Sequence, residues 1–189
     1  MTAPITRGAR NEAPPIDLKE VDLLALPLNA LIGKITATPP EITGGCVLLM
    51  NAALMSAMMT MALKLSLRKV EDPVVREVLR HRIKRMKQLQ AGCMEAASSD
   101  LAVFNEYRMA LRSRSRYKAM KVAAALRKAT DSLTAAHGLL QTVLDEAMAA
   151  REDVIESMRC DLEAGMIGLK AISDGLQILI ASNERRLEQ

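Results

Sequence analysis

The sequence predicts an all-α protein, an antiparallel bundle of four to five main helices with a long central helix. Half of the 189 residues are hydrophobic, only 2% are aromatic and 13 are methionine, a composition typical of helical proteins. Apolar residues recur every three or four positions through three long segments, and no strand-like alternation competes with that period. The connections between segments are short, which predicts antiparallel neighbours.

The chain divides into an N-terminal arm, residues 1–16, and a single helical domain, residues 17–189. The arm is rich in proline and polar residues and has no apolar stretch of the kind found in secretory signals, so we expect it to be disordered. Residues 17–35 form a short amphipathic segment, which Pro27 interrupts and which ends before a pair of prolines at 39 and 40.

The strongest local signal is Thr43-Gly44-Gly45-Cys46, which opens an uncharged run that extends to Leu63. Glycine lets backbone N–H groups approach a ligand and a helix N-terminus favours negative charge, so this start is a candidate ligand site; the alternative is a plain turn. The run is as long as the shortest membrane spans, but it contains polar residues, and methionine and alanine replace larger apolar side chains. We therefore expect a helix from about residue 45 to 70, apolar on all sides and buried, and no membrane segment.

A second helix start follows at Asp72-Pro73, where aspartate is placed to cap and proline occupies the first helical position. Helical spacing then continues to about Leu111, which predicts the long central helix. Residues 112–116 form a short polar link, residues 117–150 again have helical periodicity, and residues 153–187 form the last helix. The charged residues 151–153 are either a bend or one turn of a continuous helix.

Charge and cysteine content restrict the classes of partner. The formal net charge is +4, and the basic clusters at residues 80–85 and 112–116 could contact phosphates, but aromatic side chains for stacking on bases are almost absent. We interpret these clusters as solvated helix faces and a basic loop, and expect no nucleic-acid partner. Neither the three cysteines nor the two histidines have the spacing of metal ligands, so we expect no metal site and a reducing, cytoplasmic location.

Several stretches, in order along the chain, carry a resemblance to known motifs. Residues 40–47, Pro-Glu-Ile-Thr-Gly-Gly-Cys-Val, resemble Pro-Thr-Pro-Gly-Gly-Gly-Ser, and residues 64–69, Lys-Leu-Ser-Leu-Arg-Lys, resemble Asn-Leu-Thr-x-Gly-Lys-Lys. Residues 100–105, Asp-Leu-Ala-Val-Phe-Asn, resemble Asp-x-x-Ala-Phe-Asn/Asp; residues 125–130 resemble Ala-Leu-x-x-Ala-Thr, and residues 160–165 resemble Ser-Asp-x-Gly-x-Ala. With a closing asparagine at Asn183, the chain resembles the formiminotetrahydrofolate cyclodeaminase and methenyltetrahydrofolate cyclohydrolase family.

The resemblance implies an all-helical, homodimeric enzyme of one-carbon metabolism that takes a tetrahydrofolate derivative as substrate and needs no further cofactor. The family's reactions are hydrolysis of 5,10-methenyltetrahydrofolate and loss of ammonia from 5-formiminotetrahydrofolate. Both need a proton-transfer group, and a carboxylate in a partly apolar bundle suits the role because burial raises its pKa. Asp100 and Asp161 are the candidates for acid/base catalysis or for anchoring the pterin; the alternative is that each caps a helix or pairs with an arginine.

The expected substrate-binding residues lie at the start of the apolar helix, at its end and near the end of the chain: Gly44, Gly45 and Cys46; Lys64, Arg68 and Lys69; and Asn183. The first group would offer backbone N–H groups, and the second would hold the glutamate tail. The two groups lie at opposite ends of one helix roughly 30 Å long. We therefore predict a site shared by two antiparallel subunits. A nucleophilic thiolate at Cys46 is an alternative, but the family has serine there, which indicates a small packing residue.

Departures from the family's pattern support a second class of function. Thr43 replaces a glycine of the triple, Arg68 replaces the glycine before the lysine pair, and a Tyr-x-Leu-Pro-Lys loop is shortened to residues 112–116. Most of these changes fall where the family binds its ligand. The alternative function is therefore a non-catalytic member that binds a reduced pterin or assists subunit assembly.

Overall fold

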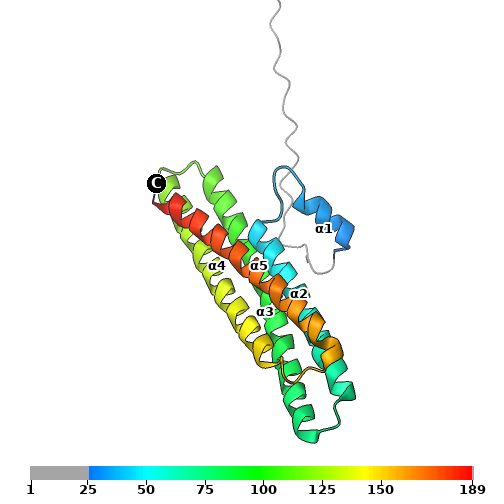
Figure 1. Ribbon diagram of the computed structural model, residues 1–189. Coiled ribbons are helices and arrows are strands. Elements are labelled where there is room, and N and C mark those ends of the chain that lie inside the picture. Colours follow the sequence, from blue (N-terminus) through cyan, green and yellow to red (C-terminus); the bar gives the residue numbers. More distant parts are fainter. Residues whose placement is uncertain (1–25, 189) are drawn as a thin grey trace, which may run out of the picture.

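The computed structural model describes residues 26–188, so the predicted arm and the first part of the domain, up to residue 25, lie outside the described residues (Figure 1). Within that range the chain forms five helices and no strands: α1 (Leu28–Ile35), α2 (Gly44–Lys69), α3 (Pro73–Arg112), α4 (Lys118–Ala149) and α5 (Glu156–Leu187). The four long helices run antiparallel to their neighbours in the chain. The predicted all-α bundle with a long central helix is confirmed.

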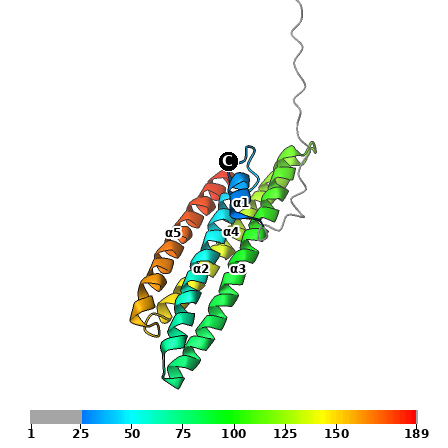
Figure 2. The same cartoon turned by 90° about the vertical axis from the view of Figure 1, so that its right-hand side faces the viewer.

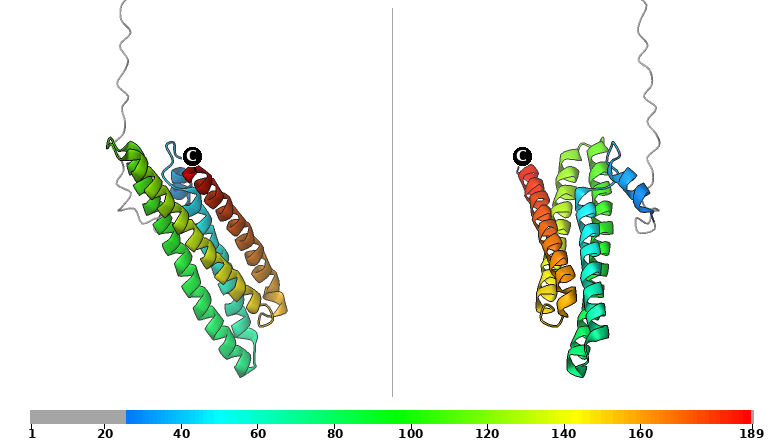
Figure 3. Two further views of the ribbon diagram at one scale, coloured as in Figure 1. Left: turned by 90° about the vertical axis from the view of Figure 1, so that its left-hand side faces the viewer. Right: turned by 45° about the vertical axis from the view of Figure 1, so that its right-hand side comes forward.

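The four long helices pack as a closed ring. α2 packs against α3 and α5, and α4 packs against the same two helices from the other side (Figure 2). The short α1 lies outside this ring, near the end at which α2 begins (Figure 3). Its side chains Leu31 and Ile35 pack against the bundle core. The start of α2 and the end of α5 therefore meet at one end of the bundle.

The helix ends follow the signals in the sequence. The Asp72 carboxylate accepts a hydrogen bond of 2.8 Å from the backbone N–H of Val74, and proline occupies the first position of α3 as predicted. Residues 151–153 lie in the connection between α4 and α5, so the helix does break there. Arg82 of α3 makes a salt bridge of 2.7 Å with Asp153 in this connection and one of 3.3 Å with Glu146 near the end of α4.

The expectation that α2 is buried on all sides is wrong for its outer face. Leu54 is 62% exposed and Met61 is 43% exposed, because the ring gives α2 two principal neighbours and leaves one face uncovered. α2 and α5 each contain a stretch long and apolar enough to cross a membrane, of which 50% and 28% respectively is buried in the bundle. Length and composition do not distinguish a membrane span from a core helix, so these two helices do not establish a span.

Two glycines bring α5 close to α2. A Cβ atom added at Gly165 would lie 2.5 Å from Cγ of Met59, and one added at Gly168 would lie 2.6 Å from the sulfur of Met55. Only a hydrogen atom fits at either position without movement of the methionine. This contact holds the two helices together along the middle of their length.

Candidate active site

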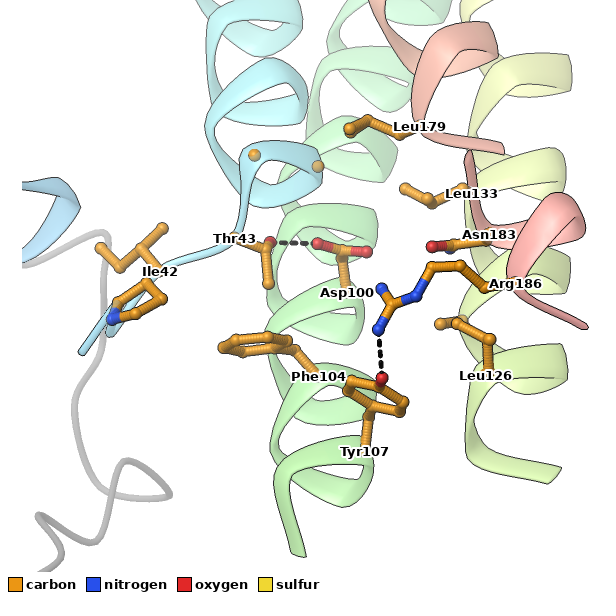
Figure 4. A pocket seen from close by; sticks show the side chains of 14 residues that line it. Ile42, Thr43, Asp100, Phe104, Tyr107, Leu126, Leu133, Leu179, Asn183 and Arg186 are labelled. Carbon is orange, nitrogen blue, oxygen red and sulfur yellow. Dashed lines mark hydrogen bonds between the residues drawn. The ribbon is translucent and has the colours of Figure 1, made fainter. Parts of the chain in front are cut away.

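A pocket of about 280 Å³ opens where the start of α2 meets the end of α5 (Figure 4). All four long helices and the segment before α2 contribute to its wall: Pro40, Ile42, Thr43, Gly44, Gly45, Asp100, Phe104, Tyr107, Leu126, Ala129, Leu133, Leu179, Asn183 and Arg186. Most of these side chains are apolar or aromatic. The few polar groups are therefore placed to orient a ligand, as in small-molecule sites generally.

The floor of the pocket is built around the Thr43 hydroxyl. It accepts a hydrogen bond of 2.9 Å from the backbone N–H of Cys46, which caps α2, and it donates a short hydrogen bond to Oδ2 of Asp100 on α3. Threonine is a good N-cap because its oxygen satisfies an N–H that has no partner in the first turn of a helix. One hydroxyl thus both starts α2 and holds the carboxyl of Asp100.

Asp100 is a buried carboxyl, with only 6% of the residue exposed. Burial raises its pKa above the ordinary value of an aspartate, while the hydrogen bonds from Thr43 and from the backbone of Cys46 oppose the rise without cancelling it. The shift arises because a carboxylate loses hydration energy inside the bundle. Asp100 therefore retains its proton to a higher pH than an exposed aspartate does, which suits a group that donates and accepts protons.

Gly45 lets Asp100 approach the start of α2. A Cβ atom at this position would lie 2.7 Å from Oδ2 of Asp100 and 2.8 Å from Cδ2 of Leu133, distances that no side chain tolerates without movement. At Gly44, by contrast, the nearest atom would be Cδ1 of Leu179 at 3.7 Å, an ordinary contact. Of the two glycines, only Gly45 is required by the packing of the site.

The outer part of the pocket contains two aromatic side chains and an arginine that the sequence reasoning did not assign to the site. Phe104 and Tyr107 follow Asp100 at i+4 and i+7, which places all three on one face of α3. Arg186, near the end of α5, donates a hydrogen bond from Nη2 to the Tyr107 hydroxyl, and its guanidinium carbon lies 5.4 Å from the centre of the tyrosine ring. Asn183, one turn earlier on α5, also lines the pocket.

Residues 27–189 match the sequence profile of the formiminotransferase-cyclodeaminase family. The chain belongs to this family. A search of curated proteins found no match. The fold is also that of the crystal structure of formiminotetrahydrofolate cyclodeaminase from Thermotoga maritima, with a TM-score of 0.78 over 87% of this chain and 81% of that chain at 16% identity. Family membership, expected from the resemblance of the motifs, is thereby confirmed.

In this member of the formiminotransferase-cyclodeaminase family, the single chain brings together only part of the residue set expected to form the site. Asp100, Gly44, Gly45 and Asn183 line the pocket. Cys46 does not line it and is fully buried, and burial, followed by the charge of Asp100, raises the pKa of its thiol to about 12. A thiolate nucleophile is therefore disfavoured at this position, and the contribution of Cys46 is its backbone N–H, which the Thr43 cap uses.

The other expected residues lie toward the opposite end of the bundle. Lys64, Arg68 and Lys69 occupy the last turns of α2, beside the start of α5. The end of α2 and the start of α5 are joined by a hydrogen bond of 3.1 Å, which the backbone N–H of Ile155 donates to the Ser66 hydroxyl. The half-buried Asp161 is in the second turn of α5, between that contact and the Gly165 contact. Within one subunit these four residues do not reach the pocket.

No group of three or more histidine, cysteine, aspartate or glutamate side chains is placed to hold a metal ion among residues 26–188. The pocket itself contributes one carboxyl, that of Asp100, and neither histidine nor cysteine. The chemistry available to the described pocket is therefore proton transfer by a carboxyl, assisted by neighbouring hydrogen-bond donors.

Proposed function

We propose that the chain is an enzyme of one-carbon metabolism that releases ammonia from 5-formiminotetrahydrofolate, with hydrolysis of 5,10-methenyltetrahydrofolate as a second reaction of the same pocket. The observation that carries this proposal is the buried carboxyl of Asp100, whose raised pKa and position in an apolar pocket suit proton transfer. Family membership and the fold of the Thermotoga cyclodeaminase support the class of substrate. Membership of a family of metabolic enzymes also supports a cytoplasmic location for this chain.

Ammonia loss needs two proton movements that one carboxyl can supply. The N10 nitrogen attacks the carbon of the protonated formimino group, –CH=NH2+, and a five-membered ring closes in which the former imino nitrogen is an amino group on the bridging carbon and N10 carries the positive charge. The protonated carboxyl of Asp100 gives its proton to that amino nitrogen, the carbon–nitrogen bond breaks, and ammonia leaves with the bonding pair. The resulting carboxylate takes the proton that N10 loses, which restores Asp100 and leaves the 5,10-methenyl bridge.

Thr43 favours a second candidate function, a reduced-pterin-binding or assembly protein without turnover. Its hydroxyl occupies one oxygen of the Asp100 carboxyl, and it stands at a position where the family pattern has glycine. In this alternative Asp100 anchors the pterin and transfers no proton. Binding without turnover is the outcome that would select it.

We further propose that the protein is a homodimer with a site shared between subunits. The outer faces of α2 and α5 are apolar and exposed, with Leu54 at 62%, Ile167 at 72% and Ile178 at 67% exposure. Burial of such a surface against a second copy is favourable, and an antiparallel arrangement would place the Lys64 end of one α2 near the pocket of the other subunit.

The first experiment follows the near-ultraviolet absorbance of the methenyl product after 5-formiminotetrahydrofolate is added to purified protein, and in a second cuvette the loss of that absorbance from 5,10-methenyltetrahydrofolate. We expect both rates to exceed the spontaneous ones and Asp100→Asn to abolish the difference, while the helical circular-dichroism signal is unchanged. Full turnover by Asp100→Asn would overturn the role of Asp100. No turnover, with folate binding retained in calorimetry, would select the binding protein.

The shared site has its own test, because Asp161 and Lys69 lie far from the pocket of their own subunit. A shared site predicts that Asp161→Asn loses turnover, and that mixing the Gly45→Ala and Lys69→Ala variants restores part of it. A site confined to one subunit predicts that Asp161→Asn is fully active and that mixing restores nothing. Sedimentation of the wild type establishes in parallel whether the protein is dimeric.

A further inference from the structure

The turn of the α3–α4 hairpin carries a concentration of positive charge. The hairpin turns at the end of the bundle where α5 ends (Figures 1 and 3). We call residues 108–121 the basic tip, because they include six basic residues and no acidic one: Arg108, Arg112, Arg114, Arg116, Lys118 and Lys121. All of these except the half-buried Arg108 are exposed to solvent.

The charges of the basic tip are not neutralised within the described part of the chain, where none of the salt bridges includes these six residues. Glu106, the acidic residue that precedes the tip on α3, pairs instead with Lys128 of α4 at 2.7 Å. The basic cluster at residues 80–85 differs, because two of its arginines form salt bridges with carboxylates. The basic tip is therefore available to an anionic partner.

Two serines hold the arginines of the tip on a hydrogen-bonded turn. The backbone N–H of Ser115 donates a hydrogen bond of 3.3 Å to the Ser113 hydroxyl, and that of Tyr117 donates one of 3.2 Å to the Ser115 hydroxyl. Both serines are half-buried, whereas the arginines that alternate with them at positions 112, 114 and 116 are exposed. The turn thus satisfies its own backbone groups and directs its charges to the surface.

Apolar side chains are exposed among these charges. Their exposed fractions are 71% for Met109, 43% for Leu111, 48% for Tyr117 and 66% for Met120. Met109 also lines a shallow groove between α3 and α4 together with two cations of the tip, Arg112 and Lys121. A partner that fits this surface has to offer negative charge and a place for apolar side chains at the same time.

A lipid surface meets both conditions better than a nucleic acid does. Anionic headgroups attract lysine and arginine, and apolar side chains next to them enter the boundary between headgroups and acyl chains. Nucleic-acid phosphates also attract the cations, but they give no gain for exposed methionines, and Tyr117 is the one aromatic residue of the tip that could stack on a base.

The proposed dimer leaves the basic tip open. That dimer buries the outer faces of α2 and α5, whereas α3 and α4 pack together on the other side of the ring. A contact through the tip therefore does not compete with a site shared between subunits.

We propose that the basic tip docks the protein on an anionic membrane surface, with its cations among the lipid headgroups and its exposed methionines in the interface. The contact is peripheral and needs no helix that spans the bilayer. The proposal goes beyond the proposed function and is independent of it, since no residue of the basic tip lines the pocket.

The first test measures co-sedimentation of the full chain with two kinds of vesicle, one of phosphatidylcholine alone and one in which about a third of the lipid is phosphatidylglycerol. We expect partitioning to the anionic vesicles to be at least about tenfold stronger, and to weaken as salt is added. A triple variant that removes three charges of the turn should lose at least about tenfold of this partitioning: Arg112→Gln, Arg114→Gln and Arg116→Gln. The matched control removes three exposed charges near the other end of α3: Lys84→Gln, Arg85→Gln and Lys87→Gln.

The second test examines the apolar part of the contact on the same anionic vesicles. Met120→Ser should weaken partitioning by about threefold or more, because the methionine loses its place in the interface. The matched control is Met148→Ser, near the other end of α4, where the methionine is 61% exposed against 66% for Met120. Circular dichroism establishes that every variant keeps the helical fold.

Loss of partitioning in the triple variant of the turn and in Met120→Ser, with both controls like the wild type, supports the proposal. A wild type that does not sediment with anionic vesicles overturns it. Equal losses in the two triple variants would reflect net charge and overturn the role of the tip, and unchanged partitioning of Met120→Ser would overturn insertion. A wild type that binds a DNA duplex and not the vesicles would identify a nucleic-acid surface and also overturn the proposal. The turnover assays judge the proposed function separately.

Discussion

Gly45→Ala is the sharpest test of how the site is built. The new methyl group would lie 2.7 Å from the Asp100 carboxyl and 2.8 Å from Leu133, so the carboxyl has to move away from the start of α2. The same substitution at Gly44 meets its nearest atom at 3.7 Å and serves as the matched control. Both residues begin the same helix, so they share the gain in helix propensity and differ in the clash.

The magnitudes separate the two variants. Alanine gains up to about 1 kcal/mol over glycine in a helix. Overpacking costs about 1–3 kcal/mol, and a buried carboxyl that loses its hydrogen bond costs about 1–3 kcal/mol more. We therefore expect Gly45→Ala to lower the free energy of unfolding by about 1–6 kcal/mol and Gly44→Ala to leave it unchanged or raise it by up to about 1 kcal/mol.

Urea unfolding followed by circular dichroism measures both differences, and thermal unfolding should place the Tm of Gly45→Ala below that of Gly44→Ala by several degrees, at roughly 2–4 °C per kcal/mol for a chain of this size. Turnover should fall in Gly45→Ala and persist in Gly44→Ala. Equal stability and equal turnover of the two variants would refute the argument that Asp100 needs the space at Gly45.

Three further predictions use simple measurements. The first compares the free energy of unfolding of the wild type with that of Asp100→Asn in urea titrations at several pH values. The difference, wild type minus variant, should fall as pH rises from the ordinary pKa of aspartate through the raised pKa of Asp100, because the folded state binds the proton more tightly than the unfolded state does. A rise of this difference over the same pH range would contradict the upward shift of the pKa. A thiol reagent at pH 8 should label the folded protein once, at the exposed Cys160. Cys46 and Cys93 are buried, and burial raises the pKa of their thiols to about 12 and about 11 respectively. Two or three labels in mass spectrometry would show that the buried cysteines become accessible to the reagent. Gly165→Ala should destabilise the fold by about 1–3 kcal/mol through its contact with Met59, whereas Gly138→Ala, which meets nothing within 4 Å, should be neutral or stabilising, as paired thermal melts would measure.

The sequence was sufficient to predict the helices because their signals are local. The apolar period, the Asp72 cap and the glycine pair each depend on residues a few positions apart, and the long helices begin and end within a few residues of the predicted positions. The separation of Lys64 from Gly45 also followed from helix length alone. Tyr107 could have been added to the site by the same arithmetic, since it lies at i+7 from Asp100.

Arg186 could not be found in this way. Its place in the pocket depends on how far α5 is shifted along α2, which the close contact at Gly165 fixes in three dimensions and which no local pattern encodes. The burial of Asp100 was likewise an expectation drawn from its neighbours in sequence, and the partner that holds it, Thr43, is 57 positions away.

The ring of four helices has a consequence for the order in which the molecule is completed. α2 with α3, and α4 with α5, are hairpins of neighbours in the chain, whereas the seam between α2 (Gly44–Lys69) and α5 (Glu156–Leu187) joins segments that are at least 87 residues apart. The pocket lies at that seam, so its wall is complete only when the last turns of α5 are in place. During synthesis on the ribosome, the wall of the pocket would therefore stay open until the last turns of α5 are made and pack against the start of α2.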